Sequence, residues 1–183
     1  YSQEPIILHN IDNTKFSYFH AMPKVHKKPL GIRPIVASIN SPTTGLSIWL
    51  TCELKPIIYK VNSYLKNSDH LISLLQNIKI DESYTLYTMD VIQLYTSIPL
   101  NTLMKNITII VNNVLECTEK EKKAIIAGIE IILFNNYFSF NKNIFLQITG
   151  IAMGATVTPF LAILYVAFYE HQINSKFKEN ISL

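Results

Sequence analysis

Residues 143–169 contain no charged side chain, and a run of this length is long enough to cross a bilayer. Two glycines, two threonines and Pro159 interrupt its first half, so we predict a loop over residues 150–158. Proline suits the first turn of a helix, which we expect to begin near Pro159. Glu170 ends the apolar part after roughly three turns, too few to span a membrane. The run therefore favours a helix buried against a sheet, and a membrane span is the alternative.

A single acid, Asp90, lies in the otherwise uncharged, aromatic and β-branched segment of residues 84–99. Thr, Tyr and Leu suit a packed, pleated surface, so we predict a buried strand over residues 84–89. Burying an acid is costly unless it is paired or bound to a metal. At the end of such a strand, Asp90 is either a structural cap or a metal ligand, and the segment alone leaves both interpretations open.

The rest of the chain alternates between strand and helix patterns, without internal repeats or low-complexity tracts. Pro34 favours an edge or a bulge for its strand, and Pro56 should break or kink its helix. We expect Asp69 to cap a short helix, and Thr118 and Glu121 to form a capping box. The predicted strands cover residues 16–22, 32–38, 137–140 and 144–147, the last two as a hairpin, and the predicted helices cover residues 41–55, 57–65, 70–78, 99–116, 118–134 and 159–176.

Length and charge limit the possible classes of protein. With 183 residues, the chain is one domain or a piece of one, and because it does not begin with Met we expect an excised piece. The net charge of +3 permits a polyanionic partner without requiring one. Cys52 and Cys117 have neither metal-ligand spacing nor a disulfide pattern, which favours an intracellular, reducing setting.

Four cations lie close together in the N-terminal part of the chain: Lys24, Lys27, Lys28 and Arg33. They belong to two predicted neighbouring strands and the turn between them. A solvated, charged turn would explain them. A phosphate clamp would also explain them, because the guanidinium of arginine matches phosphate oxygens with two parallel hydrogen bonds.

A glycine-rich segment precedes the last helix. Gly150 and Gly154 flank Met153 and allow the backbone to approach a flat ligand closely, although a plain turn or helix packing would require the same residues. Tyr95 follows Asp90 by five residues, and ordinary core packing would account for it if it stood alone.

Four blocks, taken in chain order, resemble a reverse transcriptase of the Penelope-like retroelement type, which is related to telomerase. The first block resembles the pattern LPK-x-HK…RPI-V-S, the third resembles DV-x-x-L(Y/F)T-x-IP, and the fourth resembles Q-x-x-G-x-AMG…P-x-LA. The resemblance covers about residues 16–170, and four blocks in the right order are more specific than any one motif. The four blocks read YFHAMPKVHKKPLGIRPIVAS, SPTTGLSIWL…YLKNSDHLISLLQNI, YTMDVIQLYTSIPL and QITGIAMGATVTPFLAILYVAFYE.

The resemblance implies a role for each matching residue. Asp90 would bind two catalytic Mg²⁺ ions, with the Val91 carbonyl as a further ligand. Arg33, together with Lys24, would hold the incoming triphosphate, and Tyr95 would exclude a 2′-hydroxyl and so select deoxynucleotides. The glycine-rich block would shape the floor under the templating base pair through Gln147, Gly150, Met153 and Gly154.

The resemblance also implies a fold and a set of partners. The fold would be α+β, with fingers over residues 1–82 and the first part of a palm over residues 83–183. An antiparallel palm sheet packed by helices would carry Asp90 on a central strand. The activity would be RNA-directed DNA synthesis from deoxynucleoside triphosphates on an RNA template with a DNA primer. We expect no membrane among the partners. The location would be intracellular, in the nucleus of a eukaryotic host.

The sequence departs from the family pattern in three places. The second catalytic block, a Tyr-x-Asp-Asp turn, is absent, and no Asp follows Asp90, so we expect these residues alone to be inactive. One carboxylate does not hold two Mg²⁺ ions well. Residues 155–157 replace the usual Ser-Pro-Leu, and Ile163 replaces the usual Asn. A catalytically inactive, nucleic-acid-binding remnant of a polymerase is therefore the second interpretation.

Overall fold

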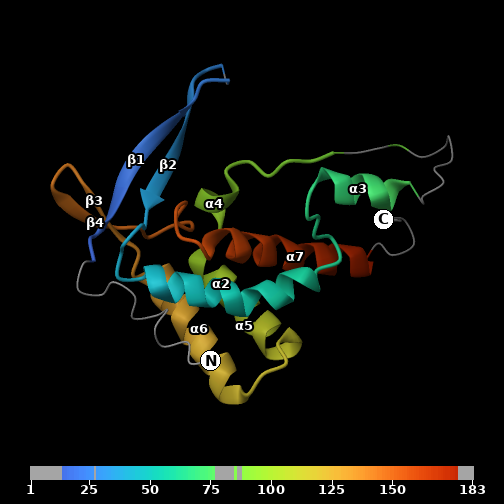
Figure 1. The fold of residues 1–183 in the computed structure, drawn as a ribbon. Helices are drawn as coiled ribbons and strands as arrows, with labels where there is room; N and C mark the ends of the chain where they lie inside the picture. Colours follow the sequence, from blue (N-terminus) through green and yellow to red (C-terminus); the bar gives the residue numbers. More distant parts are fainter. Residues whose placement is uncertain (1–13, 27, 77–84, 86–87, 177–183) are drawn as a thin grey trace.

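The computed structural model describes residues 14–26, 28–76, 85 and 88–176, and it has the mixed α+β fold that the sequence predicts. A body of helices carries a projecting sheet (Figure 1). The elements in chain order are β1 (Ser17–Lys24), β2 (Gly31–Ala37), α2 (Thr44–Tyr59), α3 (Ser68–Leu75), α4 (Leu94–Ser97), α5 (Leu100–Val114), α6 (Glu119–Phe134), β3 (Tyr137–Phe140), β4 (Asn143–Leu146) and α7 (Thr158–Lys176).

The hydrophobic core lies between α2, α5, α6 and α7. Each of these helices contributes completely buried aliphatic side chains, and burial of one such side chain stabilises the fold by about 1.5–3 kcal/mol. The regions expected on either side of residue 82 share this core, because α2 precedes that position and the other three helices follow it. Representative buried residues are Leu50, Leu54, Leu103, Ile107, Ile129, Leu161 and Leu164.

The four-stranded sheet has the order β2-β1-β3-β4. β1 pairs antiparallel with β2 and β3 pairs antiparallel with β4, but β1 and β3 are parallel, so the expected antiparallel sheet is wrong in this respect. A parallel pair requires a long crossover between its strands, and here the helices from α2 to α6 provide it. Pro34 lies on β2, the edge strand, as its missing N–H requires.

The hairpin of β3 and β4 confirms a local prediction. Phe140 and Asn143 are paired across a two-residue turn, and Asn141 and Lys142 have φ values of 47° and 65°. Positive φ at both central residues is the geometry that matches the twist of the flanking strands.

Two helix ends differ from the prediction. α2 runs through Pro56 to Tyr59, because proline removes a single hydrogen bond in the last turn while Leu54, Ile57 and Ile58 remain buried. The cap of α3 is Asn67 rather than Asp69: the Asn67 side chain accepts a hydrogen bond of 2.9 Å from the His70 N–H.

The predicted capping box at the start of α6 is confirmed. The Glu121 N–H donates to the Thr118 hydroxyl at 3.3 Å, and the Thr118 N–H donates to the Glu121 carboxylate at 2.8 Å. Hydrogen bonds from the Thr118 side chain and backbone lower the pKa of Glu121. The reciprocal bonds satisfy donors that a bare helix end leaves free.

α7 begins at Thr158 and packs against α2 and α5, so it is buried against helices and not, as expected, against a sheet. None of the helices in the described part of the chain combines the length and the apolarity needed to cross a bilayer.

Candidate functional site

The segment around Asp90 differs most from the prediction. Thr85, Thr88 and Met89 are exposed and lie outside any strand, and Met89 is 98% exposed. Tyr84 and residues 86–87 lie outside the described residues. A strand requires a neighbour that satisfies its backbone groups, and the four described strands pair with one another elsewhere. The prediction of a buried strand ending at Asp90 is therefore wrong for the residues that can be compared.

Asp90 itself is exposed and makes no hydrogen bond or ion pair with any described residue. The short helix α4 follows it, and the N-cap of α4 is Gln93, whose φ of 54° is left-handed. Asp90 therefore caps no helix in the described part of the chain. Of the two interpretations that the sequence leaves open, the structural cap has no support.

The glycine loop, residues 150–158, is anchored to β2 at one point. The Val36 N–H on β2 donates a hydrogen bond of 2.9 Å to the Met153 carbonyl. Gly154 has a φ of 148°, and a Cβ at this position would overlap the Val36 carbonyl oxygen. Only glycine allows the loop backbone to lie this close to the strand that carries Arg33.

The same loop is anchored to α4 at a second point. The Ile151 N–H donates to the Tyr95 carbonyl at 2.7 Å. Gly150 has a φ of 68°, and a Cβ there would lie 2.7 Å from both the Tyr95 carbonyl oxygen and the Thr96 Cα. The two predicted glycines thus hold the loop between α4 and β2, and they bring Tyr95 and Met153 into one region of the molecule.

Gln147 connects the end of β4 to the beginning of this loop. Its side-chain oxygen accepts from the Asn136 side chain at 2.8 Å, and its side-chain nitrogen donates to the Thr149 carbonyl at 2.9 Å. The side chain therefore holds the loop in place, and its partners are all within this chain.

Sequence reasoning missed a third anchor of the loop on α2. The buried Ser47 hydroxyl accepts from the Val157 N–H at 3.1 Å and lies 2.8 Å from the Thr156 hydroxyl. The sequence signal that could have revealed this anchor is Ser47 itself, a small polar residue among the apolar residues of a buried helix face. Thr156, one of the departures from the family pattern, takes part in this contact.

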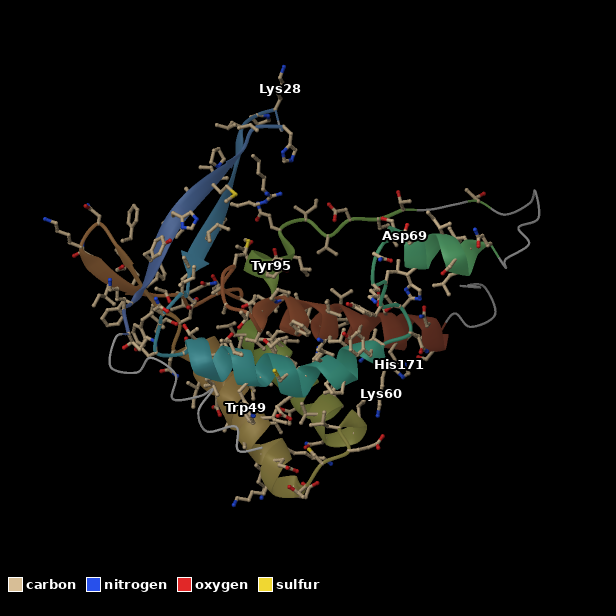
Figure 2. The ribbon with its side chains drawn as sticks, in the orientation of Figure 1. Lys28, Trp49, Lys60, Asp69, Tyr95 and His171 are labelled. Carbon is tan, nitrogen blue, oxygen red and sulfur yellow. The ribbon has the colours of Figure 1, made fainter. Side chains whose placement is uncertain are left out.

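Tyr95 is partly buried and packs against the hydrophobic core. It also lines a groove of about 350 Å³ between α4, α7 and the turn after α2. Other residues of this groove are Tyr64, Leu65, Pro159, Ile163 and Glu170. Figure 2 shows Tyr95 on α4 near the beginning of α7. Packing against the hydrophobic core therefore accounts for one side of the Tyr95 side chain, and the other side borders the groove.

The predicted cations lie on the β1–β2 ribbon. Lys24 is paired with Gly31 and Met22 is paired with Arg33, so Lys24 and Arg33 point to the same side of the ribbon. Lys28 lies at its tip and points away from the body (Figure 2). Lys27 lies outside the described residues.

The metal ligands predicted from the resemblance are incomplete. Within the described ranges, no group of three or more His, Cys, Asp or Glu side chains lies close enough to hold a metal ion. The carboxylate of Asp90 and the carbonyl of the neighbouring, half-exposed Val91 supply three oxygens at most. Mg²⁺ pairs require several hard oxygen ligands, so these residues do not form such a site by themselves.

The sequence matches no protein-family model and no curated protein. The resemblance to reverse transcriptases therefore depends on the four sequence blocks. The geometry adds that three of those blocks, on β2, on α4 and in the glycine loop, meet in space.

Proposed function

We propose that these residues are the fingers and the first part of the palm of an RNA-directed DNA polymerase. In the full-length protein, Asp90 contributes one carboxylate to a site for two Mg²⁺ ions. A second acidic block supplies the other carboxylates. The substrates are deoxynucleoside triphosphates, an RNA template and a DNA primer.

One observation carries the proposal. The glycine loop receives a hydrogen bond from β2 through Val36 and donates one to α4 through Ile151. The blocks that resemble the triphosphate clamp, the sugar contact and the floor under the base pair are therefore neighbours, although residues 36 and 153 lie far apart in the sequence. If these blocks resembled the family only by chance, nothing would require them to lie next to one another in the fold.

The side chains suit phosphoryl transfer, which depends mainly on positioning and on neutralising charge at the phosphates. Arg33 is exposed and forms no ion pair with a described residue, so its guanidinium is available for a triphosphate. Lys24 lies on the same side of the ribbon and adds a second positive charge. Bound Mg²⁺ would supply further neutralisation of phosphate charge.

Tyr95 suits the role of a sugar contact. Its backbone is held by the loop, and its ring is packed on one side and borders a groove on the other. A ring fixed in this way excludes a ligand that is larger by one hydroxyl through a steric clash.

A second candidate is a catalytically inactive remnant that still binds nucleic acid. The observation that favours it is that, among the described residues, no group of three or more potential metal-ligating side chains lies close together, at Asp90 or elsewhere. Ile163 and Thr156, which depart from the family pattern, are compatible with both candidates.

Primer extension distinguishes the two candidates. The full-length protein should extend a DNA primer on an RNA template when Mg²⁺ and deoxynucleotides are present, and chelation of the metal should stop the reaction. Nucleic-acid binding without extension, in a protein that contains both acidic blocks, would support the inactive remnant.

Replacing Tyr95 with alanine should raise incorporation of ribonucleotides relative to deoxynucleotides by about ten-fold or more, which corresponds to about 1.4 kcal/mol of lost discrimination. The measurement compares single-nucleotide extension with each substrate. Tyr95→Phe keeps the ring and should keep the discrimination. An unchanged ratio in Tyr95→Ala would remove the sugar-contact role from this residue.

A further inference from the structure

The strand β4 is an exposed, uncharged edge of the sheet. It comes last in the order β2-β1-β3-β4, and Figure 1 shows its hairpin at the margin of the molecule. Ile144 is 56% exposed, Phe145 is 44% exposed and Leu146 is 40% exposed. Edge strands of natural proteins usually carry a charge, a proline or a bulge that prevents pairing with another chain. β4 has none of these, since its register is regular and it begins the uncharged run of residues 143–169.

The free edge offers the backbone groups of Ile144 and Leu146. The Gln147 N–H donates to the Asn136 carbonyl at 3.1 Å, so these two residues form a hydrogen-bonded pair at the base of the hairpin. Hydrogen-bonded and non-hydrogen-bonded pairs alternate along an antiparallel ladder. Phe145 therefore bonds to β3, whereas the N–H and C=O groups of Ile144 and Leu146 point away from it. No other strand or loop of the described structure bonds to these groups.

The opposite edge of the sheet is protected. Pro34 on β2 has no N–H to offer, and the Val36 N–H is already bonded to the Met153 carbonyl of the glycine loop. Among the described strands, β4 therefore provides the edge that is open to pairing. A second copy that uses its own β4 closes this edge, so that assembly stops at a dimer and does not continue as a fibre.

A row of aromatic rings ends at the same edge. The Phe19 and Phe138 ring centroids lie 5.9 Å apart, and the Phe138 and Phe145 rings are stacked with centroids 5.7 Å apart. The row crosses the sheet from β1 through β3 to β4. An antiparallel second copy centred on Phe145 would add its own Phe145 directly opposite, in a non-hydrogen-bonded pair whose side chains approach closely.

We propose that two copies of the chain form a dimer by antiparallel pairing of β4 with β4, with the two-fold axis at Phe145. In this register Ile144 of each copy pairs with Leu146 of the other, which satisfies every outward backbone group of β4. Lys142, the nearest charge, lies opposite the partner's Ile148 and about 20 Å from the partner's Lys142. Physiological salt screens charge repulsion over that distance. The inference is independent of the proposed function.

The edge favours a second copy over a foreign peptide. A foreign strand would satisfy the same backbone groups, but the chain itself offers a strand whose length, register and aromatic row all match. The interface is small because β4 is short, and standard stable interfaces bury about 1,200–2,000 Å². We therefore expect a dissociation constant on the order of 10 μM.

The test is sedimentation velocity of the 183-residue chain at about 1–300 μM, a range that brackets this constant. The unaltered chain should pass from monomer to dimer as its concentration rises, without larger species. Phe145→Lys should weaken the dimer about ten-fold or more, because like charges then lie directly opposite each other, and Phe145→Glu should do the same. A mixture of the two variants should form the dimer again, since opposite charges then meet across the axis.

Ile72→Lys is the matched control. Ile72 is 54% exposed on α3, another exposed apolar surface, and its replacement should leave the dimer unchanged. Circular dichroism checks that each variant is folded, because Phe145 stacks on Phe138. Leu146→Pro provides the test if the Phe145 variants are not folded: it removes an N–H that points outward, and it should also weaken the dimer about ten-fold.

Disulfide crosslinking tests the register. In a background without Cys52 and Cys117, Phe145→Cys should form a linked dimer on mild oxidation, because the Cα atoms of a non-hydrogen-bonded pair lie about 4.5 Å apart. Ile148→Cys should crosslink far less, although Ile148 is 77% exposed, because its two copies lie about 20 Å apart in the dimer.

The outcomes separate this inference from the proposed function. A monomer at every concentration, growth beyond the dimer, equal crosslinking at the two positions, or loss of the dimer in Ile72→Lys but not in Phe145→Lys would overturn it even if the full-length protein extends primers. A dimer that is lost in each charged Phe145 variant and restored in their mixture would support it even if primer extension is never observed.

Discussion

Replacing Asp90 with alanine should reduce primer extension by the full-length protein about a thousand-fold or more. The proposed role of its carboxylate is to hold metal at the phosphates. Removal of one preorganised electrostatic group slows other enzymes by about a hundred- to a thousand-fold. The measurement is the rate of extension of a DNA primer on an RNA template under saturating Mg²⁺ and deoxynucleotides.

The structure makes Asp90→Ala an unusually clean test. Because Asp90 is exposed and has no partner among the described residues, its removal should leave the free energy of unfolding almost unchanged. Asp69→Ala is the matched control, since Asp69 is also exposed and the α3 cap is Asn67. Extension by Asp90→Ala at the rate of Asp69→Ala would refute the metal role and leave the inactive remnant as the better candidate.

Replacing Gly154 with alanine should destabilise the fold by about 3 kcal/mol or more. Its φ of 148° strains any residue with a Cβ, and the added carbon would overlap the Val36 carbonyl oxygen. Relief of the overlap requires the loop to move away from β2, which would break the hydrogen bond between the Val36 N–H and the Met153 carbonyl. The measurement is the urea concentration at the midpoint of unfolding. It is compared between variants whose free energy of unfolding depends on urea concentration with the same slope.

Gly31→Ala is the control for this prediction. A Cβ at Gly31 would meet the Lys24 side chain at an ordinary contact distance of 3.4 Å, and Gly31 lies on a regular strand. Its stability should change by less than about 1 kcal/mol. If Gly154→Ala and Gly31→Ala have the same unfolding midpoint, the glycine loop does not lie against β2 as described.

Several elements were predictable because their signals are local. Thr118 and Glu121 lie three residues apart and form the predicted capping box. The hairpin turn at Asn141-Lys142 requires only two residues with positive φ. Both features are satisfied by neighbours in the sequence, so no knowledge of the rest of the fold was needed.

Other predictions failed because their outcome depends on distant partners. The segment before Asp90 has the composition of a strand, yet the described residues there are unpaired and exposed. Pro56 has the local signal of a helix break, yet burial of the neighbouring side chains keeps α2 continuous. Composition states what a segment can form, and the available partners decide what it does form.

The same distinction between local signals and distant partners applies to the candidate site. The residues proposed to carry its chemistry, Asp90, Arg33 and Tyr95, were predicted from motifs, and so were the two glycines. The way in which β2, α4 and the glycine loop come together was not predicted, because the contacts that join them, with α2 as a further partner, span large separations in the sequence.

The order of residues by itself determined the α+β class, most helix positions, the hairpin and the residue types of the candidate site. Only the tertiary structure decided that β1 and β3 are parallel, that α7 packs on helices, and that the glycine loop lies between α4 and β2. The physical reason is the range of the interactions: caps, turns and periodicity act over a few residues, whereas strand pairing and close backbone approach are fixed by partners brought together on folding.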